Sequence, residues 1–402
     1  MHAVASAPAV IDATQLEEAK GKKLVSAATA LLVVGVLLCV AAALVDKKRF
    51  AFSYLVGFSW VVTTGLGALF FILVQHLTRA GWSVAARRHM EWIATVLPWC
   101  VVLFVPILIF RHDLFHHWMG PQAAHDELIQ KKAGYLNEPF FFARAALYFL
   151  VWTLVSLFYA KMSRKQDETG DHELTLKMQA FSAPATLLFG ITLTFAGFDW
   201  LMTLDPHWFS TIFGVYVFSG AAVSSLALLL IITVVLQESG YLKKVSNVEH
   251  RQDIGKLLFG FVVFWAYIAF SQYLLYWYAN IPEETIYFRH RWEGSWKAVS
   301  LILLFGHFVV PFLFLLSRHT KRNPTTALVG AAFMLIMHYV DLYWLVMPTL
   351  DHHGAHPSWI DLAGLLGPLG LLAFHVAKKA ADGPLYPLKD PRLAETKKVE
   401  NL

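Results

Sequence analysis

The chain has 402 residues, of which 57% are hydrophobic and only 15% are charged, and its formal net charge is +5. Soluble proteins carry about 25% charged residues, so this composition excludes an ordinary soluble protein. The only two cysteines, Cys39 and Cys100, form neither a CxxC nor a CxxCH motif, which excludes a cysteine-bound iron–sulfur cluster and a covalently attached c-type haem within this chain.

Ten long apolar stretches fill almost the whole chain. Each reaches the roughly 20 residues that an α-helix needs to cross a bilayer. Because lipid cannot satisfy backbone polar groups, the stretches should be helical, and we expect an all-α integral membrane protein with ten transmembrane helices. The stretches are Leu24–Leu44, Tyr54–Leu77, Trp92–Phe110, Phe140–Ala160, Leu174–Phe198, Trp208–Leu236, Ile254–Ala279, Trp296–Leu316, Thr325–Met347 and Trp359–Val376.

The spans divide the chain into three parts. We expect an N-terminal arm over residues 1–23, a transmembrane domain over 24–378 and an extended C-terminal tail over 379–402. The arm contains Asp12, Glu17 and Glu18 and shows no basic start before a short apolar core, so we expect no signal peptide.

The basic residues indicate how the chain is oriented. With ten spans, both termini lie on one side, and 23 of the 33 lysines and arginines fall on that side. The termini are therefore predicted to be cytoplasmic. This bias also accounts for the net charge without a nucleic-acid partner.

Several ionisable residues lie inside or beside the spans, where they are costly and indicate function. Arg144 lies about one turn into the fourth span, and His307 lies near the middle of the eighth. His338 and Asp341 are three residues apart in the ninth span and therefore share one helix face.

These groups can be sorted by their expected depth. His307 is expected between the two sides. A set that crosses the membrane in this way is what a proton path needs, and histidine titrates near working pH. The outer set is Arg144, Asp199, Asp205, His207, His338 and Asp341, near Glu283 and Glu284, and the cytoplasmic set is His76, Glu91, Asp253, Lys256 and His319.

Other interpretations compete with a proton path. Arg144 could pair with an outer carboxylate and join two helices, and His307 could be a satisfied core histidine. A b-type haem between His307 and His338 is disfavoured, because the two residues are expected at different depths. For the histidines of the outer loop, contact with a partner is favoured over a metal site; they are His112, His116, His117 and His125.

Four segments resemble a known family. They read KAGYLNEPFFFAR over 132–144, FDWLMTLDPHWFST over 198–211, DIGKLLFG over 253–260 leading to WYANIPEET over 277–285, and GHFVVP over 306–311. Together they resemble the large membrane subunits of alternative complex III, a bacterial quinol:electron-acceptor oxidoreductase. Those subunits belong to the polysulfide-reductase membrane-anchor family, and the length and ten spans of this chain resemble the shorter, second subunit.

The resemblance carries expectations about fold, location and partners. It implies two four-helix bundles, formed by helices 2–5 and 6–9 and flanked by helices 1 and 10, in the bacterial inner membrane. It implies that haem c and iron–sulfur clusters are held by partner subunits and not by this chain, for which a quinone is a candidate ligand. The implied partners are multihaem and monohaem cytochrome c subunits, an iron–sulfur subunit, the sister membrane subunit and small membrane subunits.

Three functions remain open at this point. The leading hypothesis is a respiratory subunit that contributes to proton translocation and assembly. The second is a quinol-binding subunit with its site among helices 2–5 near Arg144. The third is a secondary transporter, although Pro98, Pro106 and Pro311 do not form the paired helix breaks that many transporters show.

Overall fold

A computed structural model of the chain describes residues 14–400. Within this range the chain contains ten helical segments that are long and apolar enough to cross a membrane, and no strand. The prediction of an all-α membrane protein with ten spans is confirmed. The expectations for residues 1–13 and 401–402 lie outside the described residues.

Some of the ten spans are interrupted by short turns of another helix type, and shorter helices connect them. The spanning segments are α1 (Glu18–Val45), α2 (Lys47–Leu77), α3 (Val84–Ala94) with η1 (Leu97–Trp99) and α4 (Cys100–Ile109), α8 (Glu138–Thr169), α9 (His172–Trp200) with η3 (Met202–Leu204), α10 (Phe213–Glu238), α11 (Val248–Ala279), α13 (Trp296–Ile302) with the π-helical η4 (Leu303–Val309) and α14 (Val310–Leu316), α16 (Pro324–Val346) with η5 (Met347–Thr349), and α17 (Trp359–Ala381). The connecting helices are α5 (Arg111–Leu114), α6 (His116–Met119), η2 (Pro121–His125), α7 (Glu127–Lys131), α12 (Pro282–His290), α15 (Arg318–Arg322) and α18 (Leu393–Thr396).

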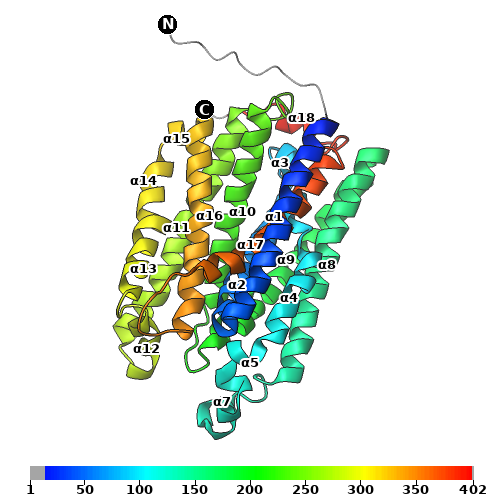
Figure 1. Cartoon of the computed structure of the whole chain (residues 1–402). Helices are drawn as coiled ribbons and strands as arrows, with labels where there is room; N and C mark the ends of the chain where they lie inside the picture. The colour runs from blue at the N-terminus through cyan, green and yellow to red at the C-terminus, as the bar shows by residue number, and fades with distance from the viewer. Residues whose placement is uncertain (1–13, 401–402) are drawn as a thin grey trace.

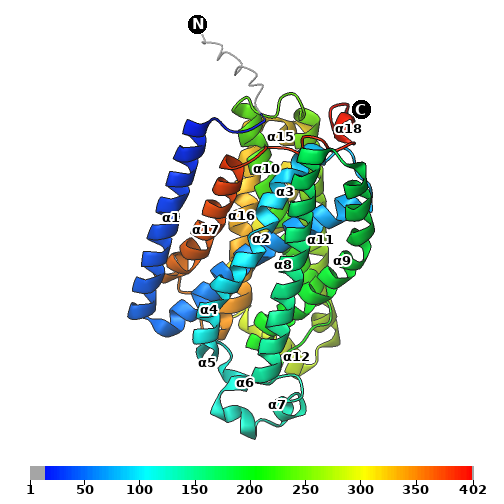
Figure 2. The same cartoon turned by 90° about the vertical axis from the view of Figure 1, so that its right-hand side faces the viewer.

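The spans form two groups that meet at α2 and α10 (Figure 1). In the first group α2 packs against α3, α4 and α9, and α8 packs against α9. In the second group α10 packs against α11 and α16, and α11 packs against α14. The outer helices α1 and α17 pair with each other, and α17 packs on α2 (Figure 2).

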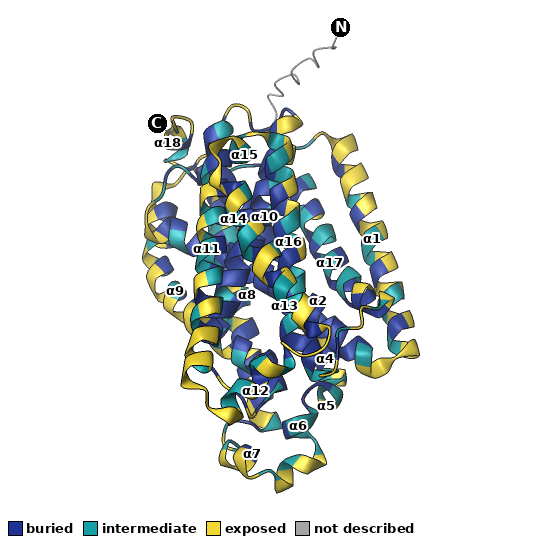
Figure 3. Cartoon of the chain, turned by 90° about the vertical axis from the view of Figure 1, so that its left-hand side faces the viewer, coloured by how far each residue is buried: buried dark blue, intermediate teal, exposed yellow. Residues whose placement is uncertain are grey.

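Burial follows this arrangement. The most apolar window of α2 is 94% buried, whereas that of α1 is 22% buried. Figure 3 shows the same contrast, with the centre of the molecule dark and α1 largely exposed. The exposed side chains of α1 are mostly apolar, as expected for a helix that faces lipid.

The two ends of the molecule differ. We call the end that carries the start of α1 and α18 the terminal end, and the end that carries α5–α7 and α12 the loop end (Figure 1). The C-terminal tail is not a free extended segment, because the Leu385 N–H donates to the Thr14 carbonyl at 2.8 Å and the Leu388 N–H donates to Asp167 at 2.8 Å. The tail therefore closes over the terminal end of the spans.

Close packing between α2 and α10 requires glycine. A Cβ atom on Gly67 would lie 2.0 Å from the Ala221 carbonyl oxygen, so only a residue without a side chain lets the two helices approach this closely. This contact places the polar face of α2 directly against the second group of helices.

Candidate functional site

Three ionisable side chains meet deep inside the second group of helices. His338 and Asp341 lie on one face of α16, which begins with the Asn323 cap and Pro324 in its first turn. His307 reaches them from η4, a single π-helical segment of a kind that often marks functional sites. Their ligand atoms lie within 4.8 Å of one another, and none of the three side chains is more than 2% exposed. We call this group the His–Asp cluster.

The close approach of His307 and His338 overturns one sequence expectation. We expected the two histidines at different depths, but they are neighbours. The length of an apolar stretch does not specify the offset between neighbouring helices, and the π-helical turn of η4 shifts the side chains that follow it.

Asp341 is held by two hydrogen bonds and by no ion pair within the described part of the chain. The Tyr216 hydroxyl on α10 donates to one carboxylate oxygen, and the Trp265 indole N–H on α11 donates to the other at 3.1 Å. The Trp265 ring also stacks on the His307 imidazole, with 3.8 Å between the ring centroids. The carboxyl group is thus buried without a positive partner, which is costly if it is charged.

A contact between the two groups of helices determines the protonation of the His338 ring. Thr63 on α2 donates its hydroxyl proton to the Ser59 carbonyl at 2.7 Å. Its oxygen must therefore accept a proton from His338 Nε2, which lies 2.8 Å away. In the neutral imidazole this leaves Nδ1 of His338 as a bare lone pair, and no hydrogen-bond partner for it is present among residues 14–400.

The His307 ring has even fewer hydrogen bonds than the His338 ring. In the described structure neither of its nitrogens has a hydrogen-bond partner. Gly220 leaves space beside the His338 ring, because a Cβ atom at this position would lie only 3.1 Å from His338 Nδ1. The His–Asp cluster therefore offers nitrogen lone pairs and a carboxylate to whatever enters it.

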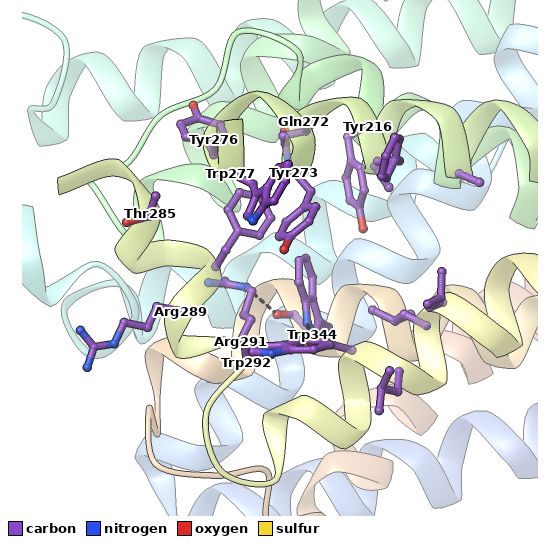
Figure 4. Close-up of a pocket in the computed structure, with 18 of the residues that line it drawn as sticks. Tyr216, Gln272, Tyr273, Tyr276, Trp277, Thr285, Arg289, Arg291, Trp292 and Trp344 are labelled. Atoms are coloured by element: carbon purple, nitrogen blue, oxygen red, sulfur yellow. Dashed lines mark hydrogen bonds between the residues drawn. The ribbon is translucent and has the colours of Figure 1, made fainter. Parts of the chain in front are cut away.

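A mostly apolar cavity of about 770 Å³ lies beside the cluster, and Figure 4 shows residues that line this cavity. Its walls come from α10, α11, α12, α13 with η4, and α16, and they include Tyr273, Trp277 and Trp344. Tyr216 and Trp265 also line it, and these are the two residues that bond to Asp341. The cavity and the carboxyl group are thus separated by one side chain.

Arg144 and Asp199 form a separate ion pair in the first group of helices, and all charges in it are paired. Two guanidinium nitrogens of Arg144 donate to the Asp199 carboxylate at 2.8 and 3.0 Å. Tyr135 and Tyr148 donate their hydroxyls to the same carboxylate at 2.8 and 2.7 Å. This pairing joins α8 to α9, as the structural interpretation of Arg144 expected. No hydrogen bond or ion pair in residues 14–400 links it to Asp341.

The remaining predicted residues lie away from both groups. His207 contacts Asp126 at 2.6 Å between two loops, and this hydrogen bond lowers the pKa of Asp126. Asp205 lies in the loop after η3. In the first turn of α12, Glu283 is exposed and Glu284 is half-buried. Lys256 bonds to Asp253 at 3.0 Å near the start of α11. The residues of the expected outer and cytoplasmic sets therefore form several separate clusters. The stretch of α2 between Thr64 and Gln75 contains only apolar residues and offers no titratable group to connect them.

Sequence reasoning found only Glu91 of a buried ionic group at the terminal end. Arg87 pairs with Asp390 of the tail, and Arg88 bonds to Asp167 at 2.5 Å. Glu91 lies 3.4 Å from Arg88 and is only 3% exposed. The tail supplies one of these carboxylates from about 300 residues away, so no local pattern could reveal it. The contact of Thr63 with His338 was also missed, because these two residues are far apart in the sequence.

The chain matches no protein-family model, and no curated protein is significantly similar to it.

Proposed function

We propose that this chain is the shorter polysulfide-reductase-like membrane subunit of a bacterial quinol:electron-acceptor oxidoreductase, in which it moves protons through the His–Asp cluster. In this proposal the chain lies in the inner membrane with both termini in the cytoplasm. It assembles with cytochrome c subunits, an iron–sulfur subunit, the sister membrane subunit and small membrane subunits, which carry the redox cofactors.

The observation that carries the proton-transfer proposal is a carboxyl group without a cation beside an imidazole with a bare nitrogen. A proton that reaches Asp341 through the Tyr216 hydroxyl neutralises the buried carboxylate. The His338 and His307 rings are the acceptors next to it, and each has a nitrogen within 4.8 Å of a carboxyl oxygen. Histidine is suited to pass the proton on, because its ordinary pKa lies near working pH.

Parts of the segments that resemble the family supply residues to the Arg144–Asp199 pair, to the cavity and to the His–Asp cluster. The segment over 132–144 supplies Tyr135 and Arg144, and the segment over 198–211 supplies Asp199. The segment over 277–285 supplies cavity residues, and the segment over 306–311 supplies His307. The residues that carry the resemblance therefore include polar groups and cavity residues. This supports a function shared with the family, because a similar apolar composition alone would not explain it.

The cavity favours quinol binding as a second candidate function. Ligand sites are concave and mostly apolar with a few polar groups that fix orientation, and about 770 Å³ is within their usual size. We expected a quinol site near Arg144, but Arg144 is engaged by Asp199. The cavity in the second group of helices is the better candidate. A photoreactive quinol analogue should label α11 or α12 there, whereas labelling of α8 alone would count against it.

Purification through an affinity tag on this chain in mild detergent tests its membership in the complex. The proposal expects c-type cytochromes, visible in the haem spectrum, and an iron–sulfur protein to copurify. A lone colourless polypeptide would contradict it. Solute uptake by the chain alone in liposomes would favour a transporter instead.

A further inference from the structure

We propose that His307, His338 and Asp341 form a binding site for a divalent first-row transition-metal ion, of which Zn²⁺ fits the ligands best. This inference does not rest on the proposed function, because it needs only the ligands and a route to them. It concerns the same three side chains and assigns them a second ligand besides the proton.

The first argument is the arrangement of the three donors. Two imidazoles and one carboxylate each offer one ligand atom, and these atoms lie within 4.8 Å of one another. Zinc sites with three protein ligands commonly combine histidine with a carboxylate and keep one position for water. The three side chains come from two segments, η4 and α16, which are packed together.

The second argument is that the nitrogens are free to bind. His338 Nδ1 has a lone pair because Thr63 holds the ring proton on Nε2. Ligating histidines almost always donate their other ring N–H to an acceptor in this way, which fixes the tautomer. Both ring nitrogens of His307 also lack a partner in the described structure. Buried polar atoms without hydrogen-bond partners are uncommon in proteins, and a bound ion is one explanation for them.

The third argument concerns Asp341. Each carboxylate oxygen accepts one hydrogen bond, from Tyr216 or from Trp265. A carboxylate has about four acceptor positions, so each oxygen can still bind a metal. The two donors orient the carboxylate, as outer partners do in known metal sites. No ion pair to Asp341 is present in residues 14–400, so a bound cation would supply the missing positive charge.

The donor set also decides which metal fits. Ca²⁺ and Mg²⁺ require several oxygen ligands, and this site has a single carboxylate. Imidazole nitrogens suit Zn²⁺, Cu²⁺, Fe²⁺ and Ni²⁺. The cavity of about 770 Å³ gives the ion a route, because Tyr216 and Trp265 form part of both the cavity wall and the surroundings of Asp341.

Cobalt titration of the full-length protein tests this proposal. The protein is purified in detergent, stripped with a chelator and titrated with Co²⁺, whose visible bands report four-coordinate binding. We expect one equivalent that Zn²⁺ displaces. The variants His338→Gln and Asp341→Asn should lose it. The control His89→Gln should keep it, because His89 is equally buried but belongs to no such cluster.

A milder variant keeps the test decisive where the site variants do not fold. Thr63→Val removes the acceptor that fixes the His338 tautomer and should weaken cobalt binding by about 10–100-fold while keeping the bands. Absence of binding to the wild type, or an equivalent that persists in His338→Gln and Asp341→Asn, would overturn the proposal. An unchanged cobalt affinity in Thr63→Val would also overturn it, since its donor argument depends on that tautomer.

Discussion

Tyr216 lies between the cavity and Asp341, because its ring lines the cavity and its hydroxyl donates a hydrogen bond to the carboxylate. The two residues are 125 positions apart and belong to α10 and α16. A molecule in the cavity is therefore one side chain away from a buried carboxyl group. Both proposed functions, proton transfer and quinol binding, use this relationship.

Replacing Tyr216 by Phe should slow proton transfer and also weaken the fold. The variant removes one of the two donors to Asp341, and leaving a buried acceptor short of a partner costs about 1–3 kcal/mol. Thermal unfolding in detergent and proton uptake in vesicles measure the two effects. Tyr273→Phe is the control, since Tyr273 lines the same cavity but does not bond to Asp341. Equal behaviour of both variants would show that the Tyr216 hydroxyl has no special role.

Replacing Arg144 by Ala should strongly destabilise the first group of helices. Asp199 is 1% exposed and would remain as a charge without its cation, and breaking such a buried pair costs about 3–5 kcal/mol. The double variant with Asp199→Asn should recover part of this loss. Unfolding of the single and double variants in detergent measures the coupling. Additive losses would contradict a direct interaction.

Removing the tail carboxylate should loosen the terminal end. Asp390→Ala leaves Arg87 buried with only Glu91, 3.7 Å away, as a carboxylate partner, so we expect a loss below the roughly 3–5 kcal/mol that a fully broken buried pair costs. Glu395→Ala is the control, because Glu395 is half exposed in its pair with Arg392 and such surface pairs contribute about 0–1 kcal/mol. Hydrogen exchange of α3 reports the opening. Equal exchange in the two variants would argue against a structural role for the tail.

The connecting segment over residues 111–137 at the loop end should lose stability in acid. Burial first, and then the nearby His116 ring, lower the pKa of His117 from 6.5 to about 4, whereas Asp205 opposes the shift. Below pH 6.5 the unfolded loop binds a proton that the folded loop does not, so stability is complete above 6.5 and falls towards pH 4. His117→Gln should flatten this profile, measured by hydrogen exchange of residues 111–137. The exposed His125→Gln should not, and a flat wild-type profile would contradict the prediction.

The close contact of Gly67 on α2 with α10 can be tested by substitution. Gly67→Ala places a methyl group 2.0 Å from the Ala221 carbonyl oxygen, and such overpacking costs about 1–3 kcal/mol or more. Gly190→Ala is the matched control, since nothing lies within 4 Å of its Cβ position and alanine favours the helix by about 1 kcal/mol. Comparable melting of the two variants would show that α2 and α10 do not meet as described.

Much of the fold could be predicted from the sequence, because crossing a bilayer requires long apolar helices. The pairing of His338 with Asp341 on one face also follows from their spacing. The approach of His307 could not be predicted, because it depends on the offset between η4 and α16. The contact of Thr63 with His338 spans 275 residues, and that of Arg87 with Asp390 spans 303. Hydropathy indicates which segments enter the membrane, but not which polar residues meet there.

The proton-to-electron ratio of the proposed oxidoreductase complex in vesicles tests the central claim most directly. The account predicts that Asp341→Asn lowers proton transfer by about 100-fold while the complex still assembles with an unchanged haem spectrum. His375→Gln, which alters a buried histidine bonded to Thr95 outside the His–Asp cluster, should keep the wild-type ratio. A wild-type ratio and wild-type turnover in Asp341→Asn would contradict proton transfer through this cluster.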